Sequence, residues 1–235
     1  HQKRKVRETE AAALYAEAKE RAALYTKRND FKVCVPLFTR VIQDYTGTSY
    51  EREARLSLAA LYCDWAKHSE KEGNYVEAAE HLKSAIEVAP ESSDYHALFY
   101  PEIPKLLMQA ANAASGKGDY ERALVYLREI KENFRAAPEA GQLDERIAEI
   151  ELNRAFDMIR EERYKDALAQ LQRIVAEHRG TKAEKSAVEK IPDVYLAMAR
   201  ELLDQGKIVE GREQLDQIIK GYEGNAAAKQ AAKEA

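Results

Sequence analysis

Five segments of this 235-residue chain recur at an almost constant interval, and this repeat limits the possible folds more than any other feature. Each segment is a turn followed by an aromatic or aliphatic residue, which we call the anchor. The anchors are Phe31, Tyr75, Tyr120, Tyr164 and Ile208, so the intervals between them are 44, 45, 44 and 44 residues. Such regular spacing predicts five copies of one structural unit.

Small residues flank every anchor at fixed distances. Three positions after the anchors stand Cys34, Ala78, Ala123, Ala167 and Gly211, and nine positions before them stand Ala22, Ala66, Ala111, Ala155 and Ala199. Seven positions after the anchors stand Phe38, Leu82, Leu127, Leu171 and Leu215, and ten positions after them stand Val41, Ala85, Ile130, Ile174 and Ile218. Offsets of 3, 7 and 10 lie on one face of an α-helix. We therefore predict a helix on each side of every turn, with the small residues allowing the two helices to approach closely.

This pattern predicts eleven helices in five hairpins and a cap. The helices are expected over 5–28, 31–45, 50–72, 75–89, 104–117, 120–134, 140–161, 164–178, 182–205, 208–222 and 226–234. The corresponding hairpins cover about 5–45, 50–89, 94–134, 138–178 and 182–222, within a single domain over 1–235. The last helix, capped by Asn225, also aligns with the start of another unit, which favours a longer natural protein. The chain begins with His1 rather than Met, so we expect residues upstream as well.

The composition supports stacked helices. Hydrophobic residues make up 45% and charged residues 33%, with 10 Gly and 6 Pro, which disfavours a disordered chain. The 37 basic and 41 acidic residues nearly balance, which disfavours binding to nucleic acid through its phosphates. No apolar run approaches the roughly 18 residues of a membrane span, so we expect no membrane insertion. Because one hairpin cannot bury both of its faces, the hairpins must stack.

The clearest copy is Gly73-Asn74-Tyr75-Val76-Glu77-Ala78-Ala79 with Leu82, Ala85 and Pro90. It resembles a tetratricopeptide repeat (TPR), and the segment from Gly118 to Leu124 with Leu127 is similar. The resemblance covers almost the whole chain and specifies a fold better than a function. It implies an all-α protein, a right-handed α-solenoid of five TPR-like helical hairpins plus a C-terminal capping helix.

The period departs from that family, whose repeat is about 34 residues. The additional residues precede each first helix, at 49–58, 94–103, 138–147 and 182–191. Pro104 and Pro192 occupy equivalent positions, so the third and fifth units are expected to bend or to carry a separate short helix there. A period near 44 also fits HEAT or armadillo arrays, which rank second because the turn and its anchor are TPR-like.

Residues that carry chemistry form no recognisable catalytic or metal-binding pattern. None of the histidines has a metal-ligand spacing, and Gly116-Lys117-Gly118 lacks the spacing of a phosphate loop. His178 occupies a position that is aromatic in three sister repeats, which predicts a packing residue. Cys34 occupies the small-residue position, and Cys63 lies within a helix. We therefore predict no catalytic residues, no metal site, no cofactor and no enzymatic activity.

In TPR proteins the first helices of successive hairpins line a concave groove. The resemblance places residues 12, 8 and 5 positions before each anchor in that groove, polar near the N-terminus (Cys63, Lys67 and Glu70 in the second hairpin) and apolar toward the C-terminus. The predicted partner-binding residues are Met108, Asn112, Leu152, Phe156, Ile159, Leu196, Arg200 and Leu203. Glu151 and Arg154 occupy normally buried positions, so a rotated helix placing Leu152 and Phe156 in the core is the alternative.

A second candidate surface is the link from Ser92 to Pro101, which contains Tyr95, Phe99 and Tyr100. These aromatic residues either form a projecting contact loop or fold back between hairpins two and three. The sequence leaves both alternatives open.

The most consistent function is a non-enzymatic scaffold that binds a peptide or helical protein partner in its groove. The alternatives are self-assembly by end-to-end stacking of hairpins, giving oligomers, and a regulatory domain of a larger envelope-anchored protein. The helix ends Tyr45-Thr46-Gly47-Thr48 and His178-Arg179-Gly180-Thr181 resemble bacterial envelope TPR proteins. They favour a periplasmic or membrane-anchored location over a cytoplasmic one.

Overall fold

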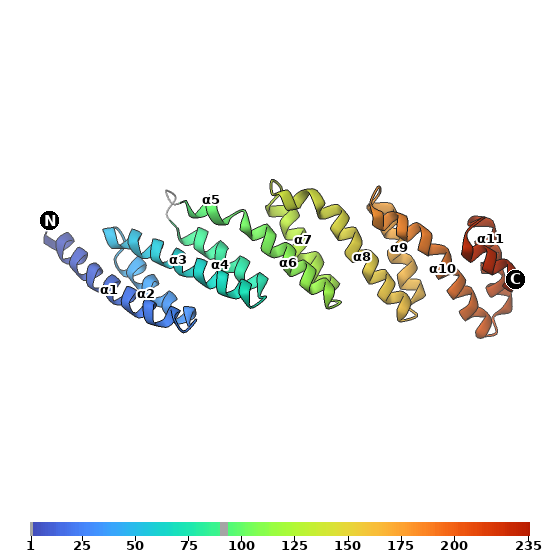
Figure 1. The fold of residues 1–235 in the computed structure, drawn as a ribbon, viewed down its shortest axis with the longest axis horizontal. Coiled ribbons are helices and arrows are strands. Elements are labelled where there is room, and N and C mark those ends of the chain that lie inside the picture. Colours follow the sequence, from blue (N-terminus) through green and yellow to red (C-terminus); the bar gives the residue numbers. More distant parts are fainter. Residues whose placement is uncertain (1, 90–93) are drawn as a thin grey trace. The chain divides into compact units, whose positions relative to one another are not determined.

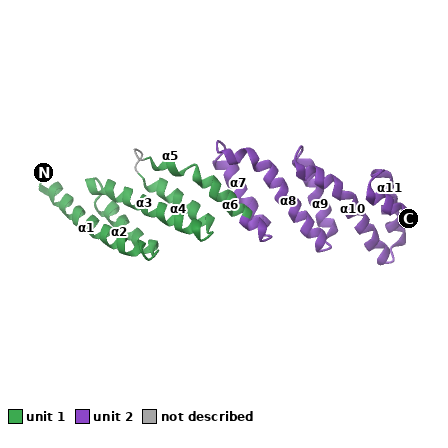
Figure 2. Ribbon diagram, in the orientation of Figure 1, with its two compact units in different colours: residues 1–112 green, residues 113–235 purple. Residues whose placement is uncertain are grey.

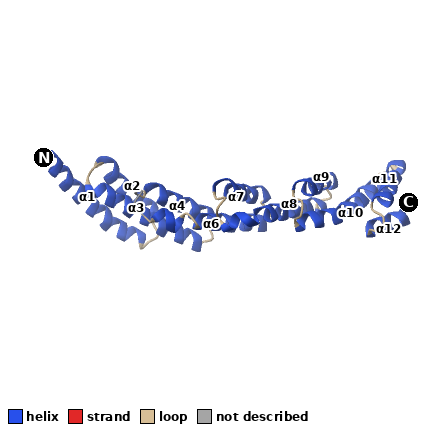
Figure 3. Cartoon of the chain, turned by 90° about the horizontal axis from the view of Figure 1, so that it is seen from above, coloured by secondary structure: helices blue, strands red, loops and turns tan. Residues whose placement is uncertain are grey.

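The computed structural model describes residues 2–89 and 94–235, and within these ranges every regular element is a helix (Figures 1 and 3). The chain divides into two compact units, residues 1–112 and 113–235 (Figure 2). Unit 1 contains α1 (Gln2–Thr26), α2 (Phe31–Asp44), α3 (Ser49–Lys71), α4 (Tyr75–Val88) and α5 (Tyr95–Phe99). The helix α6 (Glu102–Gly116) contains the boundary between the units.

Unit 2 contains α7 (Tyr120–Asn133), the 3₁₀-helix η1 (Pro138–Gln142), α8 (Leu143–Arg160), α9 (Tyr164–Glu177), α10 (Lys182–Asp204), α11 (Ile208–Gly221) and α12 (Ala226–Glu234). The prediction of an all-α chain of TPR-like hairpins is confirmed. That one solenoid domain covers the whole chain stays a prediction.

All five turns have the same backbone geometry. The residue two positions before each anchor has a positive φ, and these residues are Asn29, Gly73, Gly118, Glu162 and Gly206. The next amide N–H donates to a carbonyl five residues earlier, as from Asn74 to Ser69 at 2.8 Å and from Arg163 to Met158 at 2.8 Å. This is the Schellman arrangement, which satisfies the free carbonyls at a helix end.

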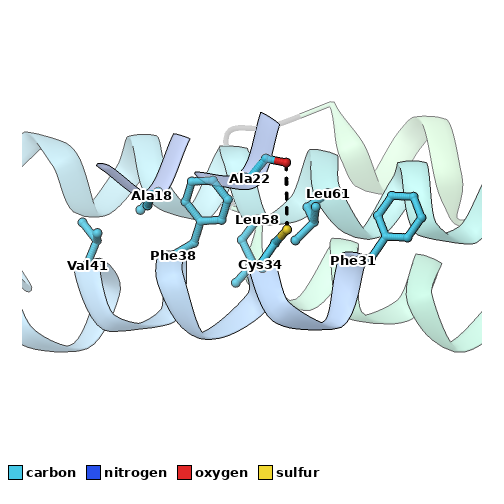
Figure 4. Close-up of a cluster of buried hydrophobic side chains, with 9 residues drawn as sticks. Ala18, Ala22, Phe31, Cys34, Phe38, Val41, Leu58 and Leu61 are labelled. Atoms are coloured by element: carbon cyan, nitrogen blue, oxygen red, sulfur yellow. Dashed lines mark hydrogen bonds between the residues drawn. The ribbon is translucent and has the colours of Figure 1, made fainter. Parts of the chain in front are cut away.

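The small residues lie where the helices of each hairpin meet. All ten predicted small positions are buried, from Ala22 and Cys34 in the first hairpin to Ala199 and Gly211 in the fifth. Figure 4 shows Cys34 directly below Ala22, with its Sγ 4.0 Å from the Ala22 carbonyl oxygen. At Gly211, an added Cβ would lie 2.6 Å from Cδ2 of Leu203. The helices therefore pack too closely there for a larger side chain without rearrangement.

The residues seven and ten positions after each anchor form the core of the units. In unit 1, Phe38 and Val41 of α2 pack with Ala18 of α1 and Leu58 of α3 (Figure 4). In unit 2, Leu171 and Ile174 of α9 pack with Ala155 of α8 and Val194 of α10, and Leu215 and Ile218 of α11 pack with the alanines of α12.

Two junctions between hairpins share a motif that explains the recurring Gly-Thr. Gly47 and Gly180 both have positive φ, and their amides donate to Glu51 at 2.7 Å and to Glu184 at 2.5 Å. The hydroxyls of Thr48 and Thr181 each donate to a carbonyl three residues earlier, at 2.7 Å. The Gly-Thr pair thus ends one helix at both junctions, and at the second junction the Thr181 hydroxyl also accepts from the Glu184 N–H and caps α10.

The additional residues before the first helices do not form one common structure. In the third unit they form the separate short helix α5, as predicted, and Pro104 lies in the first turn of α6, where its missing N–H removes no helical hydrogen bond. In the fourth unit they form η1 and the start of α8. In the fifth unit α10 continues through Pro192. A separate short helix there, one of the two predicted outcomes, is absent from the described residues.

Candidate functional site

A recessed surface of unit 1 lies along α3. A cavity of about 520 Å³ opens between α3 and α5. From α3 it is lined by residues on one face of the helix, namely Arg52, Leu56, Ala60, Cys63, Asp64 and Lys67. Residues spaced by three and four positions share a face, so a single strip of α3 forms this wall.

The opposite wall comes from the aromatic link. Asp94, Tyr95, Leu98 and Phe99 line it, and the rings of Tyr95 and Phe99 lie 5.6 Å apart between their centroids. The Tyr95 hydroxyl donates to the carbonyl oxygen of Leu56 at 3.5 Å, which ties α5 to α3. Burial raises the pKa of Tyr95, so this hydroxyl stays protonated at neutral pH. Leu98 remains largely exposed at the edge of the cavity.

A second cavity of about 260 Å³ extends the first toward the end of α3. Cys63, Lys67 and Phe99 line both cavities, so the two are adjacent. The remaining lining residues are Ala66, Glu70, Leu82, Glu102, Lys105, Leu106 and Gln109. We call the combined surface the α3 trough. From Arg52 to Glu70 it follows 18 residues of helix, or about 27 Å.

The trough has apolar walls and charged edges of both signs. Lys67 pairs with Asp64 at 3.4 Å, and Lys105 pairs with Glu102 at 2.7 Å, each within its own helix. Exposed pairs of this kind add little stability, so these side chains can exchange partners at small cost. Such a surface suits a ligand with an apolar body and polar flanks.

Cys63 is a weak nucleophile in this site. Burial raises the pKa of its thiol to about 11, so the thiol stays protonated near neutral pH. Burial also raises the pKa of Cys34, as does the charge of Asp30 nearby. Both side chains therefore behave as small buried residues.

Of the predicted link residues, Tyr95 and Phe99 line the trough, whereas Tyr100 stacks on His96 with centroids 4.7 Å apart. The link residues 92 and 93 lie outside the described residues. Of the predicted α6 residues, Met108 is half-buried and Asn112 is exposed. The trough uses other α6 residues, Lys105, Leu106 and Gln109.

The predicted apolar strip of unit 2 lies largely within its core. Leu152 and Leu196 are buried in two separate hydrophobic clusters, and Phe156, Ile159 and Leu203 pack against these clusters while half-buried. Little of Leu152 or Leu196 is left for a partner to contact. Partner binding by this strip stays a prediction.

Arg200, the remaining predicted residue, pairs with the carboxylate of Glu234 on α12, with Nε 2.9 Å from Oε2. This bond and a second one from Gln230 lower the pKa of Glu234 to about 2. Arg200 therefore holds α12 in the present structure.

The ion pairs of Glu151 and Arg154 explain why α8 does not turn about its axis to bring these two charged side chains into solvent. Glu151 is buried and pairs with Arg173 at 2.8 Å and with His178 at 3.2 Å. Arg154 pairs with Glu121 at 2.5 Å. Because both charges have partners, Glu151 stays buried and Arg154 half-buried while Leu152 also stays in the core. His178 was predicted to be a packing residue; its side chain is mostly buried, and the contact it makes, to Glu151, is polar.

Sequence reasoning missed Arg52, Leu56, Ala60 and Leu98 as parts of the trough. The sequence did point to this surface through the groove positions predicted for the second hairpin. These are Cys63, Lys67 and Glu70, and all three line the trough. Among the described residues, no group of histidine, cysteine and carboxylate side chains is arranged to hold a metal ion. No helix in the described ranges combines the length and apolar character needed to cross a membrane.

Comparisons with known proteins give similar solved structures but no sequence relatives. No family model matches the chain, and no curated protein matches its sequence. Similar solved structures include YrrB, described as a TPR protein with an unusual peptide-binding site, at 16% identity over 90% of this chain and 88% of that one, with a TM-score of 0.26. Another is TTC0263, a thermophilic TPR protein of Thermus thermophilus, at 17% identity over 95% and 97%, with a TM-score of 0.24. A third is BtubC from P. vanneervenii, at 16% identity over 98% and 91%, with a TM-score of 0.23.

At these scores the neighbours carry no argument about function. The TPR-like character of the chain is visible in its own repeated turns, small-residue contacts and anchors. None of these findings supports the resemblance to envelope proteins, which stays a prediction.

Proposed function

We propose that this chain is a non-enzymatic scaffold that binds a peptide or helical segment of another protein in the α3 trough. The observation that carries the proposal is that two adjacent cavities follow α3, the first walled by Tyr95, Leu98 and Phe99 and the second also lined by Phe99. Concave, mostly apolar surfaces with a few polar groups are typical binding sites. A trough about 27 Å long suits a segment rather than a small metabolite.

The mechanism is preorganisation. The strip on α3 belongs to a helix of 23 residues that packs on both α2 and α4, so its side chains keep a fixed spacing without the partner. The bond from Tyr95 to Leu56 holds the second wall. The partner then bears most of the ordering entropy of binding, which favours a segment that presents one apolar side chain to Leu56, Leu98 and Phe99.

The test is affinity capture from the native cell with Leu98→Asp and with Ala97→Asp as its matched control. Both residues are exposed on α5, so neither change disturbs the fold, but only Leu98 lines the trough. We expect the control to capture the same proteins as the unmodified chain and Leu98→Asp to lose one of them. Equal capture by both variants would rule out the trough as the binding site.

A further inference from the structure

Charged side chains of both signs line the α3 trough, and the basic ones already have partners. Lys67 pairs with Asp64 on α3, and Lys105 pairs with Glu102 on α6. Arg52 also has an interaction partner. All three basic residues that line the trough are therefore engaged within the chain.

Two acidic residues of the trough differ from this pattern. The side chains of Glu70 and Asp94 are exposed and make no hydrogen bond or ion pair with any residue that the structure describes. Asp94 lines only the first cavity and Glu70 only the second, so one unpaired carboxylate lies in each. Glu70 also belongs to the last turn of α3, where the partial negative charge of the helix end adds to its own. Lys71, in the same turn, lines neither cavity. The unmatched charge of the trough is therefore negative.

The walls of the trough offer few backbone groups to a partner. Of the lining residues, only Asp94 lies outside a helix. Backbone groups within a helix bond to one another, so an extended segment would leave its own N–H and C=O groups without partners there, whereas a helical segment satisfies them itself. A helix also fits the length of the trough, since a helix of about 18 residues spans the same distance.

We propose that the partner segment is an amphipathic helix with an apolar face in its middle and a basic residue near each end. This inference rests on the proposed function and adds the conformation and the charge of the segment. The apolar face contacts Leu56, Leu98 and Phe99, and the basic ends lie beside Asp94 and Glu70. Because charges at the rim of an interface mainly determine which partner is chosen, the trough selects among amphipathic helices by the charge of their ends.

The test uses three synthetic peptides of about 20 residues, long enough to fill the trough as helices. They share one leucine face and carry Lys, Gln or Glu near both ends. Fluorescence anisotropy measures the binding of each labelled peptide to the full chain. We expect the Lys peptide to bind most tightly and the Glu peptide most weakly, with a difference that shrinks as the salt concentration rises. A Lys peptide with a proline in its middle cannot form a continuous helix and should bind roughly tenfold more weakly or worse.

Matched variants assign the effect to the two carboxylates. Glu70→Gln and Asp94→Asn each remove one negative charge, and each should weaken binding of the Lys peptide about two- to fivefold while leaving the Gln peptide unchanged. Glu72→Gln makes the same change at an exposed residue that lines neither cavity, and it should have little effect on any peptide.

The failure of this inference is distinguishable from the failure of the trough. Equal binding of the Lys, Gln and Glu peptides, or a Glu72→Gln variant that behaves like Glu70→Gln, would overturn the charge that we assign to the partner. A proline peptide that binds as tightly as its parent would show an extended segment instead of a helix. In each of these cases Leu98→Asp should still weaken every peptide, which leaves the trough as the binding site. Absence of binding by all the peptides would also overturn the inference, and the capture experiment with Leu98→Asp then decides on the trough separately.

Discussion

At the scale of single residues, one backbone conformation recurs at every turn between paired helices. Three of the five positions are glycine, which adopts positive φ without steric cost, and Asn29 is among the residues that tolerate it. Glu162 has the same conformation with a φ of 59° and a long side chain. The fold therefore imposes the conformation on Glu162, at a cost of about 1–2 kcal/mol.

Replacing Glu162 with glycine should remove that cost. We expect Glu162→Gly to raise the free energy of unfolding by about 1 kcal/mol, and the converse change Gly118→Glu to lower it by a similar amount. A Cβ at Gly118 meets no atom within 4 Å, so only backbone strain is tested there. Urea denaturation measures the free energy of unfolding of both variants. Loss of stability in both variants would show that the turns do not share one conformational requirement.

At the scale of elements, α12 is held by a charged pair in addition to its three buried alanines. Hydrogen bonds from Arg200 and Gln230 lower the pKa of Glu234 from 4.5 to about 2. A lowered pKa means that the carboxylate stabilises the docked helix fully above pH 4.5. This contribution is lost as the pH falls from 4.5 to about 2.

We therefore expect the amides of α12 to lose protection from hydrogen exchange as the pH falls through this window, before those of α9. Exchange rates corrected for intrinsic pH dependence measure the effect. Glu234→Gln should abolish the difference between pH 5 and pH 2 in α12, because the group no longer titrates. A pH response that persists in this variant would assign the effect to other carboxylates.

At the scale of the whole molecule, the repeat determined what could be predicted from the sequence. The ends of the helices agree with prediction within three residues because every hairpin uses the same small residues, leucines and turns. Prediction failed where the chain departs from its repeat. Ile208 is an anchor by sequence, yet its side chain is 49% exposed, whereas the first anchor, Phe31, is buried.

The site was predicted in part for the same reason. Tyr95 and Phe99 are visible as an aromatic cluster in a nonrepeating link, but Leu56 and Ala60 become lining residues only because α5 packs beside α3. Conversely, the positions of Leu152 and Leu196 relative to the anchors predict that they line the groove, but in the structure both side chains are buried in the core. In unit 2, the burial of Leu152 goes together with ion pairs that Glu151 and Arg154 form with residues of neighbouring helices. The spacing of residues in the sequence does not show which residues of other helices will form these pairs.

The central claim is that the recurring small residues hold the paired helices together, and α9 offers a matched test. Ala167 is fully buried in the small-residue position, and Ala169, two residues later on the same helix, is exposed. The account predicts that Ala167→Leu lowers the free energy of unfolding, measured by urea denaturation, by about 1–3 kcal/mol, and that Ala169→Leu changes it by less than about 0.5 kcal/mol. Equal stability of the two variants would contradict it.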